Sequence, residues 1–392
     1  MLALYGYEEI RTPLIEEASV FGRSLGEGAE IVTKQMYRFE DRGGRTVALR
    51  PEGTAPVVRA LIEHGLDKTA SLSRLYYLGP MFRAERPQAG RRRQFHQLGV
   101  EVFGSASPYQ DVEVICLLCR LLERWQIGDW VLKLNSVGCQ TDRKRMVKRV
   151  QAELGKQASA LCPDCRTRLE KNPLRILDCK EPGCQKQTAS LDLSGDVCAD
   201  CGGHFKRVTG SLERLKIPFT LDPRLVRGLD YYTRTAFEVI HEGLGAQNAL
   251  GGGGRYDDLV ELMGGRSVPA IGFAVGLERV LMARPPEAGR QALQRRGGAF
   301  VATVSPEQIP EAVALVEWLR AQGVAASANL EDRPLKRQLE QASKAMPQGC
   351  VLILGEDEIR QGVVTVKELS TGQQRQIPRS ALVETVFEGS KG

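Results

Sequence analysis

The sequence predicts an α+β protein with more than one domain, and three observations lead to this prediction. The chain has 392 residues, whereas a single domain usually holds about 100–200 residues. Two strand-like runs, Leu75–Phe82 and Phe95–Phe103, flank a polar loop and are typical of a pair of antiparallel strands. From Ala299 onward strand-like and helix-like segments alternate, which indicates a separate α/β domain.

The composition excludes several classes of protein. Hydrophobic residues make up 42% and charged residues 26% of the chain, which excludes bulk disorder. The apolar runs are far shorter than the roughly 20 residues of a membrane span, and the first residues lack the basic region of a signal peptide. A net charge of +6 permits a nucleic-acid partner without demanding one. The ten cysteines are unevenly spread over a long chain and do not resemble a secreted disulfide pattern, so we expect a cytoplasmic enzyme.

The texture of the sequence divides the chain into five parts. We expect residues 1–135 and 221–283 to form one main domain, interrupted by a cysteine-rich insertion at 136–220 whose apolar periodicity is weak. Residues 284–298 are rich in Pro, Gly and Arg and are typical of a linker. In residues 299–392 we expect strands at 299–304, 324–329 and 350–354, helices at 310–322 and 335–346, and a hairpin around 370–373.

An arginine-rich loop joins the two predicted antiparallel strands. The segment 82–93 holds five arginines, at positions 83, 86, 91, 92 and 93. A guanidinium group offers forked donors and keeps its charge, so such a loop suits phosphate groups. The alternative is a basic loop that is merely solvated.

Alternation along the second strand separates two faces. Leu98, Val100 and Val102 share one face, which suits a core, and His96 on that face is interpreted as a core histidine. The other face carries Phe95, Gln97, Gly99 and Glu101. A buried sheet face with these polar groups predicts a binding floor, where the ring stacks on a base and the carboxylate holds an ammonium group. The alternative is a solvated face.

Two further segments offer polar groups at the start of a helix. Glu52 and Thr54, around Gly53, either bind an amine or cap the helix expected over 55–62, and their spacing favours capping. Arg279 lies in the first turn of a helix expected at 277–282, where a basic side chain opposes the helix dipole. A phosphate ligand would remove this conflict, and the alternative is a surface arginine.

A third region combines a dense polar segment with glycines. The stretch Arg227–Glu238 joins a loop to a strand and contains Tyr231 and Tyr232, and the run Gly251–Gly254 precedes Tyr256. Consecutive glycines allow close approach of the backbone to a ligand. The spacing matches neither the Rossmann fingerprint nor the P-loop, which disfavours both kinds of nucleotide site.

The insertion contains two Cys-x-x-Cys pairs. Cys162 with Cys165 and Cys198 with Cys201 predict one tetrahedral, structural zinc site with four thiolate ligands. Cys179 and Cys184 would replace one pair in an alternative ligand set, and His204 is a weaker candidate. Reduced thiols or a redox pair are the remaining interpretations.

Four motifs together resemble a known family. They are the Gly6…Pro13 segment, the stretch FRAERPQAGRRRQFHQLGVE at 82–101, the stretch RGLDYYTRTAFE at 227–238 and the stretch GFAVGLER at 272–279. They are similar to the histidyl-tRNA synthetase family of class II aminoacyl-tRNA synthetases. The resemblance implies an antiparallel sheet with flanking helices, a C-terminal α/β anticodon-binding domain, and a cytoplasmic homodimer. It also implies ATP-dependent ligation of histidine to tRNA(His) through a histidyl-adenylate, with Mg²⁺.

The resemblance also implies roles for individual residues. Arg83, Arg227 and Arg279 would be catalytic, with Arg83 and Arg227 at the α-phosphate and Arg279 at the γ-phosphate. The ATP-binding set would be Arg83, Arg91, Phe95, Glu101 and Arg279. The histidine-binding set would be Glu52, Gly53, Thr54, Arg83, Gln97, Glu101, Arg227, Tyr231, Tyr232 and Tyr256.

Two features depart from the family pattern. The family carries a further segment before Gly6, with a long interface helix, so we expect this chain to be short at its start. The cysteine-rich insertion is not a general family feature. Two rival functions are a regulatory paralogue that lacks the tRNA domain, and a non-catalytic zinc-containing nucleic-acid-binding module. The intact arginine set and the presence of residues 299–392 favour the enzyme.

Overall fold

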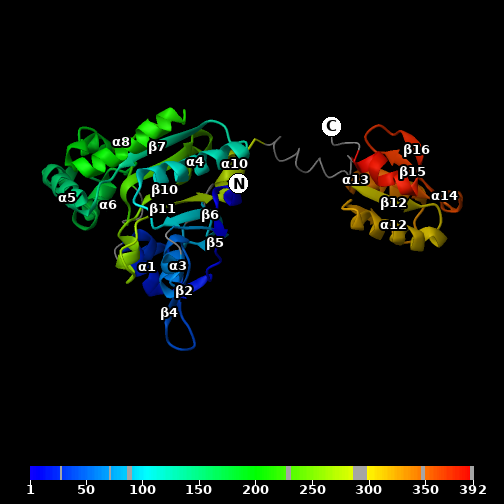
Figure 1. Ribbon diagram of the computed structural model, residues 1–392, viewed down its shortest axis with the longest axis horizontal. Coiled ribbons are helices and arrows are strands. Elements are labelled where there is room, and N and C mark those ends of the chain that lie inside the picture. Colours follow the sequence, from blue (N-terminus) through cyan, green and yellow to red (C-terminus); the bar gives the residue numbers. More distant parts are fainter. Residues whose placement is uncertain are drawn as a thin grey trace. The chain divides into compact units, whose positions relative to one another are not determined.

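The protein is described by a computed structural model that covers residues 1–26, 29–69, 72–85, 91–226, 231–285, 298–345 and 349–388. The chain forms two compact units, Met1–Arg284 and Pro285–Gly392, which are drawn in Figure 1. Most of the predicted linker 284–298 lies outside the described residues. Within those residues, every helix is too short or too polar to span a bilayer.

A sheet of eight strands organises the first unit and confirms the predicted α+β class. Its strand order is β1-β5-β6-β11-β10-β9-β7-β8, and all neighbours are antiparallel except β1 with β5 and β7 with β8. The bounds in this order are Glu8–Glu9, Ser73–Phe82, Gln94–Phe103, Ala270–Gly276, Ala249–Arg255, Thr233–His241, Trp130–Ser136 and Thr220–Leu221. The predicted antiparallel pair is therefore confirmed as β5 with β6.

Helices α4 (Pro108–Arg124) and α8 (Ala199–Arg214) contribute to the core on one face of this sheet. Leu98, Val100 and Val102 of β6 belong to this core, as the alternation predicted. The prediction for His96 was wrong, because this residue lies at the exposed start of β6 and its backbone N–H and ring nitrogen contact Glu278. The core begins only beyond the first residues of the strand.

The other face of the sheet packs against α1 (Ala18–Leu25), α2 (Thr54–Glu63) and α9 (Leu259–Leu262). The carboxylate of Glu52 accepts the backbone N–H groups of Thr54, at 2.7 Å, and Ala55, at 2.8 Å. These bonds satisfy free donors at the start of α2, so the predicted capping role is confirmed for Glu52. A small antiparallel sheet lies nearby, with β2 (Ile15–Glu17), β4 (Thr46–Leu49) and β3 (Arg38–Glu40) in that order, and α3 spans Leu66–Thr69.

The stretch predicted as an insertion, 136–220, is largely helical. It contains α5 (Gln140–Gly155), α6 (Pro163–Lys171), α7 (Pro182–Thr188) and α8. Residues between Met146 and Leu193 build a small core of their own. Helix α8 belongs instead to the main core, to which it contributes Val208 and Leu212.

The second unit is a five-stranded sheet with order β13-β12-β14-β15-β16. Strands β12 (Ala299–Thr303), β13 (Ala326–Ala328) and β14 (Cys350–Leu354) are parallel, and β15 (Val363–Glu368) and β16 (Gln374–Pro378) form the predicted hairpin. Helices α12 (Ile309–Ala321) and α13 (Leu335–Ala345) match the predicted helices. Sequence reasoning missed the short helix α14 (Glu356–Gln361).

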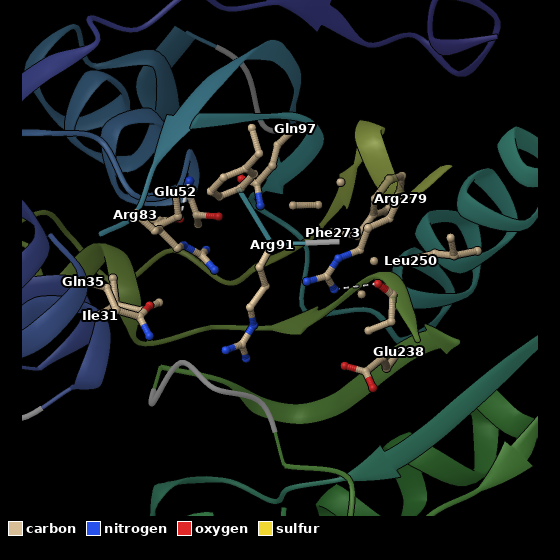
Figure 2. A pocket seen from close by; sticks show the side chains of 18 of the residues that line it. Ile31, Gln35, Glu52, Arg83, Arg91, Gln97, Glu238, Leu250, Phe273 and Arg279 are labelled. Atoms are coloured by element: carbon tan, nitrogen blue, oxygen red, sulfur yellow. Dashed lines mark hydrogen bonds between the residues drawn. The ribbon is translucent and has the colours of Figure 1, made fainter. Parts of the chain in front are cut away.

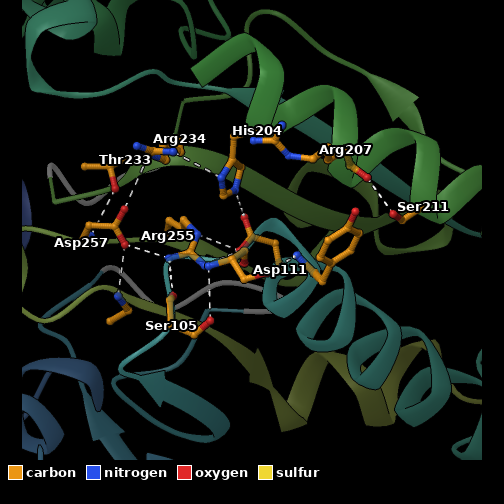
Figure 3. Close-up of polar contacts among 12 residues, drawn as sticks. Ser105, Asp111, His204, Arg207, Ser211, Thr233, Arg234, Arg255 and Asp257 are labelled. Atoms are coloured by element: carbon orange, nitrogen blue, oxygen red, sulfur yellow. Dashed lines mark hydrogen bonds and ion pairs between the residues drawn. The ribbon is translucent and has the colours of Figure 1, made fainter. Parts of the chain in front are cut away.

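A buried ion-pair network joins the end of β10 to α4 and α8, as Figure 3 shows. Arg255, which is fully buried, donates to Asp111 at 2.7 Å and to the carbonyl oxygens of Ser105 and Ser107. The second carboxylate oxygen of Asp111 lies 2.7 Å from Nε2 of His204. His204 therefore serves this network, and its candidacy as a zinc ligand was wrong.

The network predicts a large stability effect from one substitution. In Asp111→Ala the guanidinium of Arg255 loses its fully buried counter-charge and keeps Asp257, which is 2.9 Å away and partly exposed, so we expect a loss of about 3–5 kcal/mol in the free energy of unfolding. Glu123→Ala on the same helix is the control, because its ion pair with Arg120 is half exposed and such pairs contribute about 0–1 kcal/mol. Urea unfolding measures both variants, and equal losses would contradict the assigned role of Asp111.

Candidate active site

A cavity of about 420 Å³ opens in the first unit (Figure 2). Strands β5, β6, β9, β10 and β11, the start of α10 (Leu277–Ala283) and a short helical segment at Ile31–Gln35 line it. It brings together most of the residues predicted from sequence. These are Glu52, Thr54, Arg83, Arg91, Phe95, Gln97, Glu101, Tyr231, Tyr232, Tyr256 and Arg279. Arg227 lies outside the described residues.

The floor of the cavity follows from the alternation of β6. Phe95, Gln97 and Glu101 point to the cavity side of the strand. The predicted gap at Gly99 is filled by Tyr77 of the neighbouring strand, because a Cβ atom at Gly99 would lie 2.2 Å from that ring. Gly53 approaches the same ring from the start of α2, where a Cβ would lie 2.3 Å away. Tyr77 lines the cavity and was missed from sequence, although its place opposite Gly99 in the register is a usable signal.

Glu101 is a buried acid at the centre of this floor, with 1% of its surface exposed. Its carboxyl group accepts hydrogen bonds from Oγ1 of Thr54, at 2.7 Å, and from the hydroxyl of Tyr256. Gly272 on the adjacent strand leaves the required space, since a Cβ there would lie 2.0 Å from Oε2 of Glu101. Burial raises the pKa of Glu101 to about 8, against the two hydroxyl donors, which lower it. This carboxyl group is therefore largely protonated at neutral pH when the cavity holds no cation.

A second acid and an amide lie close to Glu101. Burial raises the pKa of Glu52, against the backbone N–H groups of Ala55 and Thr54, which lower it. Oε1 of Gln97 is buried and makes no hydrogen bond among the described residues. A buried acceptor without a donor is costly, so a ligand that donates a hydrogen bond would stabilise this side of the cavity.

Three tyrosines pack together beside these acids. The ring centroids of Tyr231 and Tyr232 are 4.8 Å apart, and those of Tyr231 and Tyr256 are 5.5 Å apart. Each ring is at most 7% exposed. Burial raises the pKa of the Tyr256 hydroxyl well above its usual value, and the negative charge of Glu101 raises it further. The hydroxyl therefore keeps its proton and remains a donor to Glu101.

Arg83, Arg91 and Arg279 extend into the same cavity, as Figure 2 shows. Arg83 donates to the carbonyl oxygen of Pro51 at 3.0 Å, and Arg279 donates to that of Ala249 at 2.8 Å. Burial lowers the pKa of Arg83 and of Arg279, and the charge of Arg91 lowers that of Arg279 further. Cations gathered in a partly buried space predict an anionic ligand, because an anion would compensate both burial and mutual repulsion.

Arg83 and Arg91 each make one further contact with a residue that lines the cavity. The guanidinium carbon of Arg83 lies 5.1 Å from the ring centroid of Phe95, within the range of a cation–π contact. Arg91 forms an ion pair with Glu85 at 3.0 Å. Arg175 and Glu238 also line the cavity and were missed as site residues. Arg175 comes from a distant segment without a recognisable spacing, whereas Glu238 ends the stretch 227–238 but was given no role there.

The cysteines of the insertion form two clusters instead of the predicted single set. Cys162 and Cys165 lie with Cys179 and Cys184, whereas Cys198 and Cys201 lie with Cys139 and Asp142. The ligand set Cys162, Cys165, Cys198 and Cys201 was therefore wrong. The reason is that the first pair starts α6 in the small core, while the second pair starts α8, which packs into the main core.

Comparisons with known proteins show the family to which the chain belongs. The sequence model of the family described as histidyl-tRNA synthetase matches residues 1–159 and 183–280, and that of the anticodon binding domain matches residues 299–388. The histidine–tRNA ligase of Moorella thermoacetica is 48% identical over 389 residues, which span 97% of this chain and 90% of that protein. That of Desulforudis audaxviator is 47% identical over 390 residues, spanning 99% and 92%.

A solved structure agrees as well. The crystal structure of apo histidyl-tRNA synthetase from S. aureus aligns with a TM-score of 0.80 and 34% identity, over 98% of this chain and 92% of that one. The sequence matches and this structural match each cover nearly the whole chain. The chain therefore belongs to the histidyl-tRNA synthetase family.

Proposed function

We propose that this chain ligates L-histidine to tRNA(His), consuming ATP and releasing AMP and pyrophosphate through a histidyl-adenylate. The observation that carries the proposal is a single cavity lined both by the buried carboxyl group of Glu101 and by several arginines, among them Arg83, Arg91 and Arg279. The carboxyl group suits the ammonium group of an amino acid, and the arginines suit a triphosphate. The family membership of the chain supports the same function.

Glu101 would hold the ammonium group of histidine. An ammonium group beside the carboxyl group favours its charged form, so binding would lower the raised pKa of Glu101 and release its proton. Oε1 of Gln97 and the hydroxyl of Thr54 lie on the same cavity wall and would complete the contacts. Glu52 and Gly53 support this wall from the start of α2. The packed rings of Tyr231, Tyr232 and Tyr256 would shape the pocket for the imidazole ring.

The arginines would hold ATP. Arg83, which lies against the ring of Phe95, would contact the α-phosphate together with Arg227, and Phe95 would stack on adenine. Arg279, in the first turn of α10, would bind the γ-phosphate. An anion there would offset the unfavourable placement of a cation at a helix N-terminus. Arg91 would contact the rest of the triphosphate.

Positioning and charge explain the chemistry that we propose. The carboxylate oxygen of histidine attacks the α-phosphorus of ATP, the bond to the bridging oxygen breaks, and pyrophosphate leaves. Both reactants are anions and negative charge accumulates, so fixed cations stabilise the transition state without a protein nucleophile. In the second step a terminal ribose hydroxyl of tRNA attacks the carbonyl carbon of the adenylate and AMP leaves. We assign no general base for this step.

Magnesium fits the cavity beside the arginines. Mg²⁺ prefers oxygen ligands, usually one or two carboxylates together with substrate phosphates. Glu238 presents a carboxylate on the wall that Arg279 also lines, and we propose that it holds Mg²⁺ together with phosphate oxygens. The ion, when bound, would neutralise phosphate charge.

Further partners follow from the family assignment. We propose that the second unit contacts tRNA(His), since its sequence matches the anticodon binding domain, and that the protein works in the cytoplasm, where tRNA is charged. A homodimer is supported by Leu14, Ile15 and Phe39, whose side chains remain 43–49% exposed around the small sheet. Sedimentation that finds only monomer at working concentrations would contradict the dimer.

The first functional prediction concerns Arg83 and Arg227. Replacing either by alanine would remove a cation proposed to bind the α-phosphate, and losing one preorganised donor typically costs about 10²–10³-fold in rate. We therefore expect histidine-dependent ATP–pyrophosphate exchange to fall by this factor. Arg120→Ala is the control, because Arg120 pairs with Glu123 on the exposed side of α4. Near-normal exchange in Arg83→Ala would contradict the assignment.

The second functional prediction concerns Glu101→Gln. We expect histidine affinity to fall while ATP affinity changes little, because the variant keeps the shape and loses the charge. The two affinities are measured separately by equilibrium binding. An equal loss for both ligands would count against the placement of the ammonium group.

The same variant tests the raised pKa of Glu101. Between pH 4.5 and about 8 the unfolded chain has lost the proton that the folded protein still holds, so the contribution of Glu101 to stability falls as pH rises. This slope is about 1.4 kcal/mol per pH unit. The Gln variant cannot titrate, so its free energy of unfolding should fall less steeply than that of wild type. Parallel pH profiles in urea unfolding would refute the raised pKa.

A further inference from the structure

Four cysteine sulfur atoms converge in the small core of the insertion. Cys162 lies at the start of α6 and Cys165 in its first turn, and Cys184 lies in the first turn of α7. Cys179 follows a short helical segment, Pro173–Ile176. All four Sγ atoms lie within 4.8 Å of one another. Three separate pieces of chain thus meet at one point through their thiols.

The spacing of these atoms matches ligands around one ion. A tetrahedral zinc site with Zn–S bonds of 2.3 Å places its sulfur atoms about 3.8 Å apart, and Sγ of Cys162 lies 4.0 Å from Sγ of Cys179. A disulfide bond would bring two sulfur atoms to about 2.05 Å, and all ten cysteines of the chain are free. The spacing of the sulfur atoms therefore fits four ligands of one metal ion and does not fit disulfide bonds.

Backbone N–H donors stabilise thiolates in this cluster, but burial makes several thiolates costly unless a cation binds them. The N–H of Cys162 donates to Sγ of Cys184 at 3.2 Å, and the N–H of Cys165 donates to Sγ of Cys162 at 3.4 Å. Such donors stabilise negative charge on sulfur. Cys165 is 0%, Cys184 1% and Cys179 8% exposed. Several buried thiolates without a counter-charge would repel one another, and a divalent cation removes this repulsion.

We propose that Cys162, Cys165, Cys179 and Cys184 bind one zinc ion with a structural role. A tetrahedral shell of four sulfur ligands is the set that zinc accepts. Four thiolates leave no open position for a substrate or a water molecule, which excludes a catalytic role. The ion would supply folding energy by holding the cysteine-bearing segments of this small core together.

The site also bears on the active-site cavity. The segment between Cys165 and Cys179 carries Arg175, which lines the cavity described above. Zinc bound at both ends of this segment would fix the stretch from which Arg175 reaches the cavity. The role of Arg175 in the cavity rests on the proposed function, whereas zinc binding does not. A protein without zinc would contradict the zinc site alone, and a protein without ligase activity would contradict the proposed function alone.

The second cluster, which contains Cys139, Asp142, Cys198 and Cys201, provides a matched control. Its carboxylate is already engaged, because Asp142 pairs with Arg145 and accepts the N–H of Cys139 at 3.2 Å. We assign no metal to it. Replacing Cys198 and Cys201 by serine removes the same number of thiols from the same insertion and leaves the proposed zinc ligands intact.

Metal analysis of full-length protein, purified without chelator, tests the proposal. We expect about one zinc per chain in wild type and in Cys198→Ser/Cys201→Ser. We expect a loss of at least about tenfold in Cys162→Ser/Cys165→Ser and in Cys179→Ser/Cys184→Ser, since each lacks half of the ligands. Zinc retained in either of the last two variants, zinc lost in the control, or wild type without zinc would overturn the ligand set.

A spectroscopic measurement keeps the proposal testable where a variant fails to fold. Wild-type protein exchanged with Co²⁺ is expected to show the absorption bands of tetrahedral cobalt with thiolate charge transfer. Cobalt that binds without these bands would contradict a four-thiolate site. Neither readout depends on histidine, ATP or tRNA.

Discussion

The burial of one carboxyl group, that of Glu101, constrains the architecture of the active-site cavity. An acid in the middle of a sheet is costly unless donors surround it. The fold supplies a hydroxyl from the start of α2, through Thr54, and another from the loop after β10, through Tyr256. It also leaves space on β11, where Gly272 lies opposite. The start of α2, the loop after β10 and strand β11 are distant in sequence, yet all three must meet around the side chain of Glu101.

The adjacent residue connects this cavity to the stability of the unit. Arg255 and Tyr256 are neighbours at the end of β10, yet their side chains enter different parts of the unit. Tyr256 reaches Glu101 in the cavity, while Arg255 enters the buried network with Asp111 and His204. Because that network anchors the end of β10 to α4 and α8, it also fixes the position from which Tyr256 reaches Glu101. Loss of the network would therefore disturb the cavity as well as the core.

Local periodicity made much of the site predictable from sequence. The alternation of β6 separated Phe95, Gln97 and Glu101 from Leu98 and its neighbours, because side chains on a strand change face at every residue. The same logic was wrong for His96, because strand periodicity does not tell where along the strand the core begins. Capping by Glu52 was predictable because the contact spans only a few residues.

Contacts between distant segments were the part that sequence did not reveal. The Cys-x-x-Cys spacing indicates local geometry suited to a metal, yet it does not say which pairs meet, and the fold separates Cys162 from Cys198. The buried pairing of Arg255 with Asp111 joins residues 144 positions apart and has no sequence signature. Tyr77 was missed because its partner Gly99 lies on another strand.

Proton release on histidine binding tests the central role of Glu101 most directly. Calorimetric titration of wild-type protein with histidine, in buffers of different ionisation enthalpy, counts the protons released. With the pKa of free Glu101 at about 8, we expect close to one proton released at pH 7 and clearly less at pH 8.5, where the free carboxyl group is already mostly ionised. Histidine binding without proton release at pH 7 would contradict a neutral Glu101 that becomes charged against the substrate ammonium group.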